Sequence, residues 1–258
     1  MKKVLIVGGA GYIGGFLTDL LVEEEYEVDV YDSLLFEDRF LKDVNFISGD
    51  VRNRAKLESI VHDYDTVVWL AAVVGDAACA VNEELTESVN YDSVKWLVDS
   101  YKGKIVFAST CSVYGINNDL LDENSSTNPL SLYAETKLRA EKYIIENYDN
   151  YLIFRLGTLF GIGDFSSRLR LDLVVNILTM RAAQGDLLPV FGGDQWRPLL
   201  HVRDVGHAIH HGIENGIVGL YNLSYKNYRI KDIAEEISKI VGDVEIKYTD
   251  LKYEDLRN

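Results

Sequence analysis

The chain has 258 residues, 47% hydrophobic and 26% charged, which suits one α/β domain with a large core, alone or with a small lobe. It has 26 Lys and Arg residues against 41 Asp and Glu residues, which gives a formal net charge of −15. This negative charge disfavours nucleic acids and anionic membrane surfaces as partners. The two cysteines, Cys79 and Cys111, form no metal-binding or disulfide pattern, so we expect no metal site and a cytoplasmic protein. No apolar run approaches the roughly 20 residues that span a bilayer.

Short apolar runs alternate with amphipathic stretches in the first part of the chain. The runs predict strands over residues 4–7, 28–31, 45–47, 66–70, 105–108 and 151–155. Most are apolar throughout, as expected for a parallel sheet that is covered on both faces. Apolar residues at helical spacing lie between them, over residues 13–21, 55–61, 89–97 and 134–144. This alternation predicts a Rossmann-type α/β fold with a doubly wound parallel sheet.

The composition changes near residue 157, where Gly, Pro and polar loop residues become denser. We therefore predict a Rossmann domain over residues 1–156 and a smaller C-terminal α/β substrate lobe over residues 157–258. The lobe is expected to be interleaved with the first domain and to pack against the carboxyl edge of the sheet, where such folds bind ligands.

The first predicted strand runs directly into a glycine-rich turn with the sequence GGAGYIG. Gly8, Gly11 and Gly14 permit a tight turn, a close approach to a pyrophosphate and close packing of a helix on the sheet. The helix that begins there offers free N–H groups, at residues such as Tyr12 and Ile13, to phosphate oxygens. Three glycines alone also fit an ordinary flexible turn, but their place between a strand and a helix favours dinucleotide binding.

Acidic and small residues end the next three predicted strands. Asp32 lies 18 residues after the last glycine of the turn, where a carboxylate bonds the adenosine ribose and disfavours the 2′-phosphate of NADP. We therefore predict NAD as the cofactor, the alternative being a solvated acid at a strand end. We expect Asp50 to accept from the adenine amino group while Val51 covers the ring. Ala71 and Ala72 are small enough to let a cofactor lie against the backbone.

A Tyr-Lys pair and a hydroxyl cluster are the candidates for catalysis. Tyr133 and Lys137 lie four residues apart in a predicted helix and share one of its faces. We expect the ammonium to lower the tyrosine pKa from about 10, so that Tyr133 takes a proton from a substrate hydroxyl while Lys137 bonds the nicotinamide ribose. Ser109 and Thr110 end the fifth predicted strand, where we expect a cofactor contact and a contact to the reacting oxygen, respectively. The alternative is that both hydroxyls only cap the strand or the loop.

The glycine turn with its acid, the hydroxyl cluster and the Tyr-Lys pair follow one another along the chain. In this order they resemble the pattern of the extended short-chain dehydrogenase/reductase family, specifically its NAD-dependent sugar-nucleotide epimerase/dehydratase group. The matching segments are GGAGYIG, the VYG stretch after the hydroxyl cluster, and YAETK. The resemblance implies oxidation at C4 of a nucleotide sugar, with hydride passing to NAD while Tyr133 removes the hydroxyl proton. It places Thr110 at the family's catalytic Ser/Thr position and Asn90 near the cofactor. It also implies a homodimer formed by the helices that begin near Asn90 and Tyr133.

The resemblance extends into the second lobe. A segment RPLLHVRD implies that its first residue, Arg197, grips the nucleotide diphosphate. Thr158 stands where the family often has a diphosphate-binding Asn, so we expect it in the substrate site. Arg168 and Arg170 are candidates for contacts to the sugar or phosphates, or else form a solvated basic face. Residues 221–223 resemble the strand that closes this lobe.

The predicted activity is a C4 epimerase that holds NAD tightly because it recycles the hydride. A C4 dehydrogenase that releases a 4-keto nucleotide sugar is the alternative. Cys111 and Ser112 stand where the 4,6-dehydratases of the family carry an Asp-Glu pair, which disfavours water elimination. A non-catalytic NAD-binding sensor is disfavoured because Tyr133 and Lys137 are both present. The family usually continues past a segment like residues 250–258, which implies that part of the substrate lobe is missing.

Overall fold

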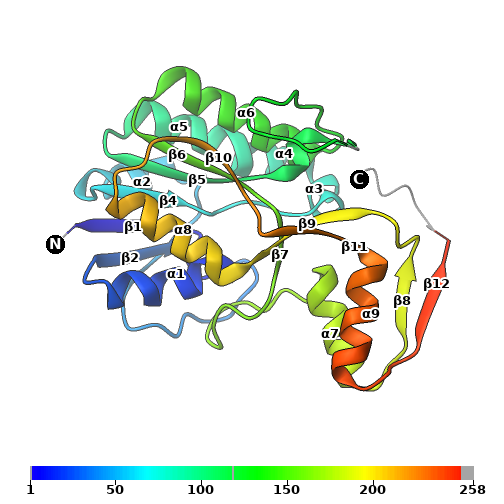
Figure 1. Cartoon of the computed structure of the whole chain (residues 1–258). Helices are drawn as coiled ribbons and strands as arrows, with labels where there is room; N and C mark the ends of the chain where they lie inside the picture. The colour runs from blue at the N-terminus through cyan, green and yellow to red at the C-terminus, as the bar shows by residue number, and fades with distance from the viewer. Residues whose placement is uncertain (1, 118, 251–258) are drawn as a thin grey trace.

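The computed structural model describes residues 2–117 and 119–250 and has a larger body built on one parallel sheet (Figure 1). The sheet has seven strands in the order β10-β6-β5-β4-β1-β2-β3, and this reversal of order next to β1 confirms the doubly wound Rossmann-type fold. Six of the strands lie at the six predicted positions. The strands are β1 Lys3–Val7, β2 Glu27–Asp32, β3 Asn45–Ser48, β4 Thr66–Trp69, β5 Lys104–Thr110, β6 Tyr151–Leu156 and β10 Gly219–Leu223.

Helices cover both faces of this sheet because successive side chains of a buried strand point to opposite sides. In β1, Val4 and Ile6 join an apolar cluster with α1 (Tyr12–Glu23) and α8 (Val202–Glu214). Leu5 and Val7 join the opposite cluster, with α5 (Ser93–Ser100) and α6 (Leu132–Asn147). The short helices on this body are α2 Arg54–Glu58, η1 Val61–Asp63, α3 Asp76–Val81, α4 Glu83–Glu87, η2 Ser88–Asp92 and η3 Cys111–Tyr114.

The strand over residues 219–223 corrects one prediction. It was expected to close the smaller lobe, but it pairs parallel with β6, so that Asn222 lies opposite Arg155 in the large sheet. The preceding helix α8 packs beside α1, where Gly206 leaves room for the ring of Phe16. Residues 202–223 therefore return to the first body after the chain has already entered the lobe.

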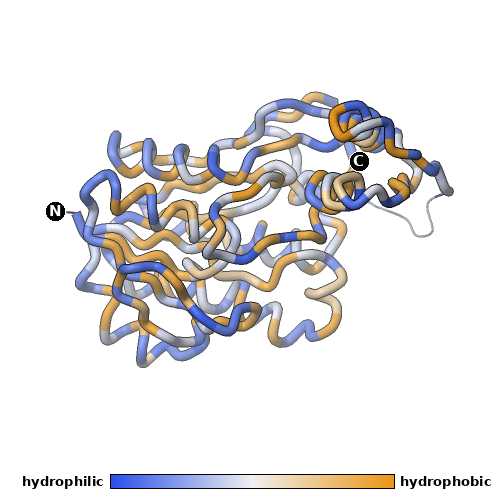
Figure 2. The backbone as a smooth tube through the Cα atoms, turned by 90° about the horizontal axis from the view of Figure 1, so that it is seen from below, coloured by the Kyte–Doolittle hydropathy of each residue, from blue (hydrophilic) through white to orange (hydrophobic). Residues whose placement is uncertain are grey.

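The smaller lobe lies at the right of Figure 1 and has its own apolar cluster. In it, β12 pairs parallel with β8, and α7 packs against α9. A three-stranded sheet in the order β11-β9-β7 connects this lobe to the larger body. Figure 2 shows that apolar and polar stretches alternate along the chain in both parts. The elements are β7 Thr158–Phe160, α7 Val174–Ala183, β8 Leu188–Phe191, β9 Trp196–His201, β11 Lys226–Arg229, α9 Ile230–Val241 and β12 Ile246–Thr249.

Within the described ranges, no helix is both long enough and apolar enough to cross a membrane. The expectation of a missing C-terminal segment was drawn from residues that mostly fall in 251–258, outside the described part of the chain.

Candidate functional site

The glycine-rich turn lies between β1 and α1 at the carboxyl edge of the sheet. Gly8 has φ +86°, and a Cβ there would lie 2.5 Å from the backbone nitrogen of Ala71. The turn therefore requires glycine both for its conformation and for its close contact with the segment that follows β4. Helix α1 begins after Gly11 with no side-chain cap and no acidic residue in its first turn. Its first N–H groups and the positive end of its dipole are thus suited to bind a phosphate.

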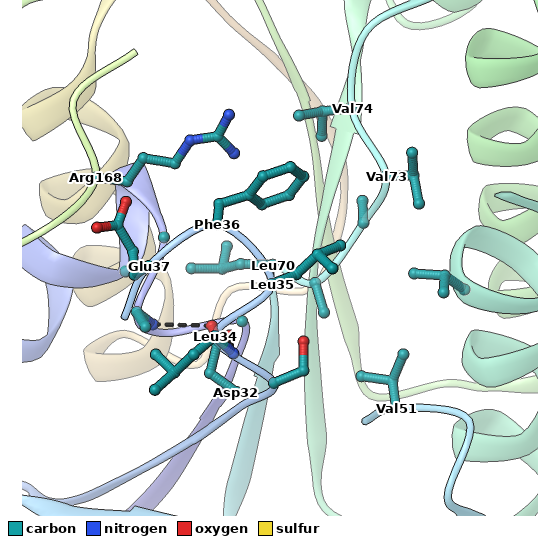
Figure 3. A pocket seen from close by; sticks show the side chains of 18 of the residues that line it. Asp32, Leu34, Leu35, Phe36, Glu37, Val51, Leu70, Val73, Val74 and Arg168 are labelled. Carbon is teal, nitrogen blue, oxygen red and sulfur yellow. Dashed lines mark hydrogen bonds between the residues drawn. The ribbon is translucent and has the colours of Figure 1, made fainter. Parts of the chain in front are cut away.

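A pocket opens directly above this turn (Figure 3). It is lined by ten of the residues that the sequence predicted for the cofactor, contributed by the carboxyl ends of β1, β2, β3 and β4 and by the start of α1. These ten are Gly8, Gly11, Tyr12, Ile13, Gly14, Asp32, Asp50, Val51, Ala71 and Ala72.

The two acidic residues predicted for the pocket, Asp32 and Asp50, differ in the groups that hydrogen-bond to their carboxylates. The Asp32 carboxylate accepts from the N–H groups of Ala10 at 3.0 Å and Leu34 at 2.8 Å, which holds it between the glycine turn and the next loop. The carboxylate of Asp50 is bound by the guanidinium of Arg52 at 2.6 Å, and this hydrogen bond lowers the pKa of Asp50. If the adenine amino group bonded to Asp50, it would share the carboxylate with Arg52, which already donates hydrogen bonds to both carboxylate oxygens.

Asn90 lies in the π-helical turn η2 and does not line the pocket itself. Its Oδ1 accepts from the N–H of Val73 at 2.8 Å, and its Nδ2 donates to the Val73 carbonyl at 2.9 Å and to Thr136 on α6 at 3.3 Å. Val73 lines the pocket, so Asn90 acts on the pocket wall and ties it to the helix that carries Tyr133.

The side chain of Thr110 interacts with that of Tyr133 and favours the phenolate form of the tyrosine. Thr110 ends β5 and also accepts from the N–H of Ser112 at 3.2 Å, which fixes its hydroxyl at the start of η3. Tyr133 interacts electrostatically with Arg170, which lines the first pocket, and with Cys111, which lines a second pocket. Tyr133, Lys137 and Thr110 line neither of these two pockets themselves, so the phenol is near residues of both pockets without forming the wall of either.

Burial controls the titration of the Tyr-Lys pair. It raises the pKa of Tyr133 to about 12, against the opposing effect of Thr110. Burial also lowers the pKa of Lys137 to about 7, although the carboxylate of Glu141 opposes this shift. The expectation that Lys137 lowers the tyrosine pKa is therefore wrong for the ligand-free chain, because both charged forms lose their hydration. The Lys137 ammonium lies 4.2 Å from the ring centroid of Phe107, so an aromatic ring takes the place of water beside it.

Ser109 does not face the cofactor pocket. Its hydroxyl donates to the carboxylate of Glu141, which also forms a buried ion pair with Arg155 at 2.8 Å. Arg155 is the single charged residue among the otherwise uncharged residues 151–156, and an isolated charge of this kind in a buried strand indicates a buried partner.

The second pocket has a volume of about 670 Å³ and brings together Thr158 and Arg197 from the predicted substrate site. Arg155, Tyr114 and Asn222 line it as well, although none was predicted there. Arg168 and Arg170, which were predicted to contact substrate, line the first pocket instead. Both arginines lie in the loop between β7 and α7, which packs against the first turns of α1.

A model of the NAD dependent epimerase/dehydratase family matches residues 4–224. The chain belongs to this family. This membership confirms the resemblance described above. It also confirms that the chain is an enzyme and that its cofactor is NAD.

Individual relatives agree with this assignment. The chain is 30% identical to the UDP-glucose 4-epimerase of Halalkalibacterium halodurans, with 93% of this chain and 80% of the relative covered. It is 29% identical to a putative UDP-glucose 4-epimerase of Methanocaldococcus jannaschii, with 80% and 71% covered. Among solved structures it resembles the UDP-N-acetylglucosamine 4-epimerase of Methanobrevibacter ruminantium, in complex with UDP-N-acetylmuramic acid, with a TM-score of 0.86 and 26% identity over 99% of this chain and 87% of that chain.

The first pocket of this family member fits NAD on its own geometry. The glycine turn admits a pyrophosphate, the uncapped start of α1 supplies N–H donors, and Asp32 offers a carboxylate at the end of β2.

Proposed function

We propose that the chain is a nucleotide-sugar 4-epimerase whose catalytic residues are Tyr133, Lys137 and Thr110. The observation that carries the proposal is the interaction of the Tyr133 side chain with Thr110, together with its electrostatic interactions with Arg170 of the first pocket, which fits NAD, and with Cys111 of the second pocket. The names of the relatives, which are UDP-sugar 4-epimerases, support the reaction and the substrate class.

The residues divide the chemistry between them. Tyr133 takes the proton of the C4 hydroxyl as the C4–H bond breaks, and Thr110 holds the oxygen that becomes the ketone. Bound NAD⁺ supplies the hydride acceptor, and its cationic ring favours the tyrosinate that burial otherwise disfavours. After the keto-sugar has turned in the pocket, Tyr133 would return the proton to the ketone oxygen, and the hydride would return from the bound cofactor to the opposite face of C4. Lys137 is assigned to the nicotinamide ribose.

The second pocket is assigned to the nucleotide sugar. Arg197 suits a diphosphate because a guanidinium forms paired hydrogen bonds with phosphate oxygens. Thr158 lines the same pocket and replaces the Asn expected there from the family resemblance. Cys111 and Ser112 also line it and supply no carboxylate, which favours epimerisation over loss of water.

The experiment is incubation of the purified protein with UDP-, dTDP-, GDP- and CDP-sugars, following product mass and the NADH absorbance band. We expect an isomer of unchanged mass without net NADH. Loss of two hydrogens with NADH accumulation would identify the alternative, a C4 dehydrogenase, and loss of water would identify a dehydratase.

Tyr133→Phe provides the test of the assigned base. Loss of a general base lowers turnover by about 100- to 10,000-fold, while NAD stays bound. The matched control is Tyr143→Phe on the same helix, whose hydroxyl donates to Asp99 at 2.6 Å outside both pockets. Substantial activity in Tyr133→Phe would show that another group is the base.

We also propose that the chain is a cytoplasmic homodimer that associates through α5 and α6. Ile145 is 41% exposed on α6, which gives this surface an apolar residue. Sedimentation velocity tests the oligomeric state, and a monomer at micromolar concentration would contradict it.

A further inference from the structure

A loop from the C-terminal half of the chain crosses the cofactor pocket. Residues 161–172, here called the strap, connect β7 to α7 and place Arg168 and Arg170 in the pocket wall. The loop after β2, residues 33–44, lies on the same side and contributes Phe36 and Glu37 to the wall. The pocket is thus bounded by two loops that are more than 100 residues apart in the sequence.

The strap is seated on the first turns of α1. A Cβ at Gly15 would lie 2.1 Å from Oδ2 of Asp164 and 2.3 Å from Cβ of Ser167. Tyr12, the first residue of α1, donates its hydroxyl hydrogen to the carbonyl of Gly161 at the start of the strap. The glycines of the phosphate-binding turn end at Gly14, so the absent side chain at Gly15 serves the strap.

Lys42 connects the strap, α1 and the loop after β2. Its ammonium lies 2.6 Å from a carboxylate oxygen of Asp19 on α1 and 3.2 Å from Asp164 in the strap. The Lys42 side chain is only 5% exposed and that of Asp164 only 13%. Such partly buried pairs are screened by solvent much less than exposed ones.

Arg168 and Phe36 form a second contact between the strap and the loop after β2. The guanidinium carbon of Arg168 lies 3.9 Å from the centroid of the Phe36 ring, within the range of a cation–π interaction. Figure 3 shows the two side chains next to each other, with the Phe36 ring between Arg168 and Val74. Both side chains line the pocket and contact each other across the two loops.

We propose that the strap retains bound NAD, through the Lys42–Asp164 ion pair and the Arg168–Phe36 contact, so that Arg168 acts on the cofactor and not on the sugar. Release of a dinucleotide past this side of the pocket requires both contacts to separate. Retention suits an enzyme that transfers a hydride to its cofactor and takes it back. The inference depends on NAD binding alone, so it can be tested whether or not the protein is a 4-epimerase.

The test measures the dissociation rate of labelled NAD from the loaded protein after addition of excess unlabelled NAD. We expect dissociation to become at least about tenfold faster in Lys42→Met and Arg168→Leu, which is a loss of about 1.4 kcal/mol of retention. Gly15→Ala should act in the same direction because its Cβ displaces the strap. Lys42→Arg, which keeps the charge, should retain NAD like the unmodified protein.

The control is Lys231→Met, which breaks the 2.5 Å ion pair with Asp194 in the smaller lobe. We expect this variant to release NAD at the original rate. Should Gly15→Ala fail to fold, Lys42→Met and Arg168→Leu still decide the matter. Unchanged dissociation in these two variants, or a rise in the sugar KM with no change in NAD release in Arg168→Leu, would overturn the proposal.

Discussion

Lys137 shows how burial sets the chemistry of single residues in this protein. Its side chain is 2% exposed, and its ammonium faces an aromatic ring rather than water. The groups that act on it are the carboxylate of Glu141 on its own helix and the thiol of Cys79 on α3. The spacing of Tyr133 and Lys137 could be read from the sequence, but the direction of both pKa shifts depends on how much water the fold leaves around them.

Lys137→Met should stabilise the ligand-free protein at pH 7. The pKa of Lys137 falls from 10.5 to about 7 on folding, so the unfolded chain binds more protons between these pH values. The stability of the unmodified protein relative to the variant therefore rises with pH, by on the order of 2 kcal/mol between pH 7 and pH 9. Urea unfolding of both proteins at the two pH values measures this, and a constant difference would contradict it.

At the scale of elements, one buried polar network connects α6, the helix of Tyr133 and Lys137, to three strands. Strand register places Ser109 of β5 next to Arg155 of β6, and Arg155 next to Asn222 of β10. Glu141 of α6 accepts from Ser109 and Arg155, while Tyr114 receives a hydrogen bond from Arg155 at 2.9 Å. The network thus holds the helix of Tyr133 against the floor of the second pocket.

Glu141→Gln should lower the free energy of unfolding by about 3 kcal/mol, because Arg155 would keep its charge in a buried site without a carboxylate. The control is Glu27→Gln, which removes the exposed pair with Lys3 at 2.8 Å and should cost less than about 1 kcal/mol. Urea unfolding at pH 7 compares the two. Equal small losses would show that the buried pair contributes no more than a surface pair.

The strands of the large sheet differ in how well the sequence predicted them. Six contain the short apolar runs from which they were predicted, and each was predicted within a few residues of its position. The seventh, β10, is an edge strand whose residues are partly exposed, so its pattern carries no sign of the sheet that it joins. Its pairing with β6, like the packing of α8 beside α1, shows that the chain returns to the first body.

At the scale of the whole molecule, the large body is completed by residues distant in sequence. The apolar cluster on the α1 face contains Val106 and Leu152 together with Val205, Ile209 and Ile213 of α8. The cluster that covers this face is therefore incomplete in the first 156 residues alone.

A fragment of residues 1–156 should therefore lack the cooperative unfolding of the full chain. Without α8 and β10, it would expose the apolar face of β6 and part of α1 to water. Urea titration followed by circular dichroism, with the full chain as the reference, measures the difference. A sharp transition with full native helix content in the fragment would mean that the first body folds without the returning segment.

The sequence by itself determined the features that depend on neighbouring residues. These are the glycine turn, the acid at the end of β2, the alternation of strands and helices, and the spacing of Tyr133 and Lys137. Periodicity and glycine conformation encode such features locally.

Only the tertiary structure decided which partners distant polar side chains would find. Ser109 bonds Glu141 rather than a cofactor, and Arg168 belongs to the first pocket rather than to the second. No local pattern specifies these contacts, because they depend on loops and strands that meet only after the chain has crossed between its two bodies and returned.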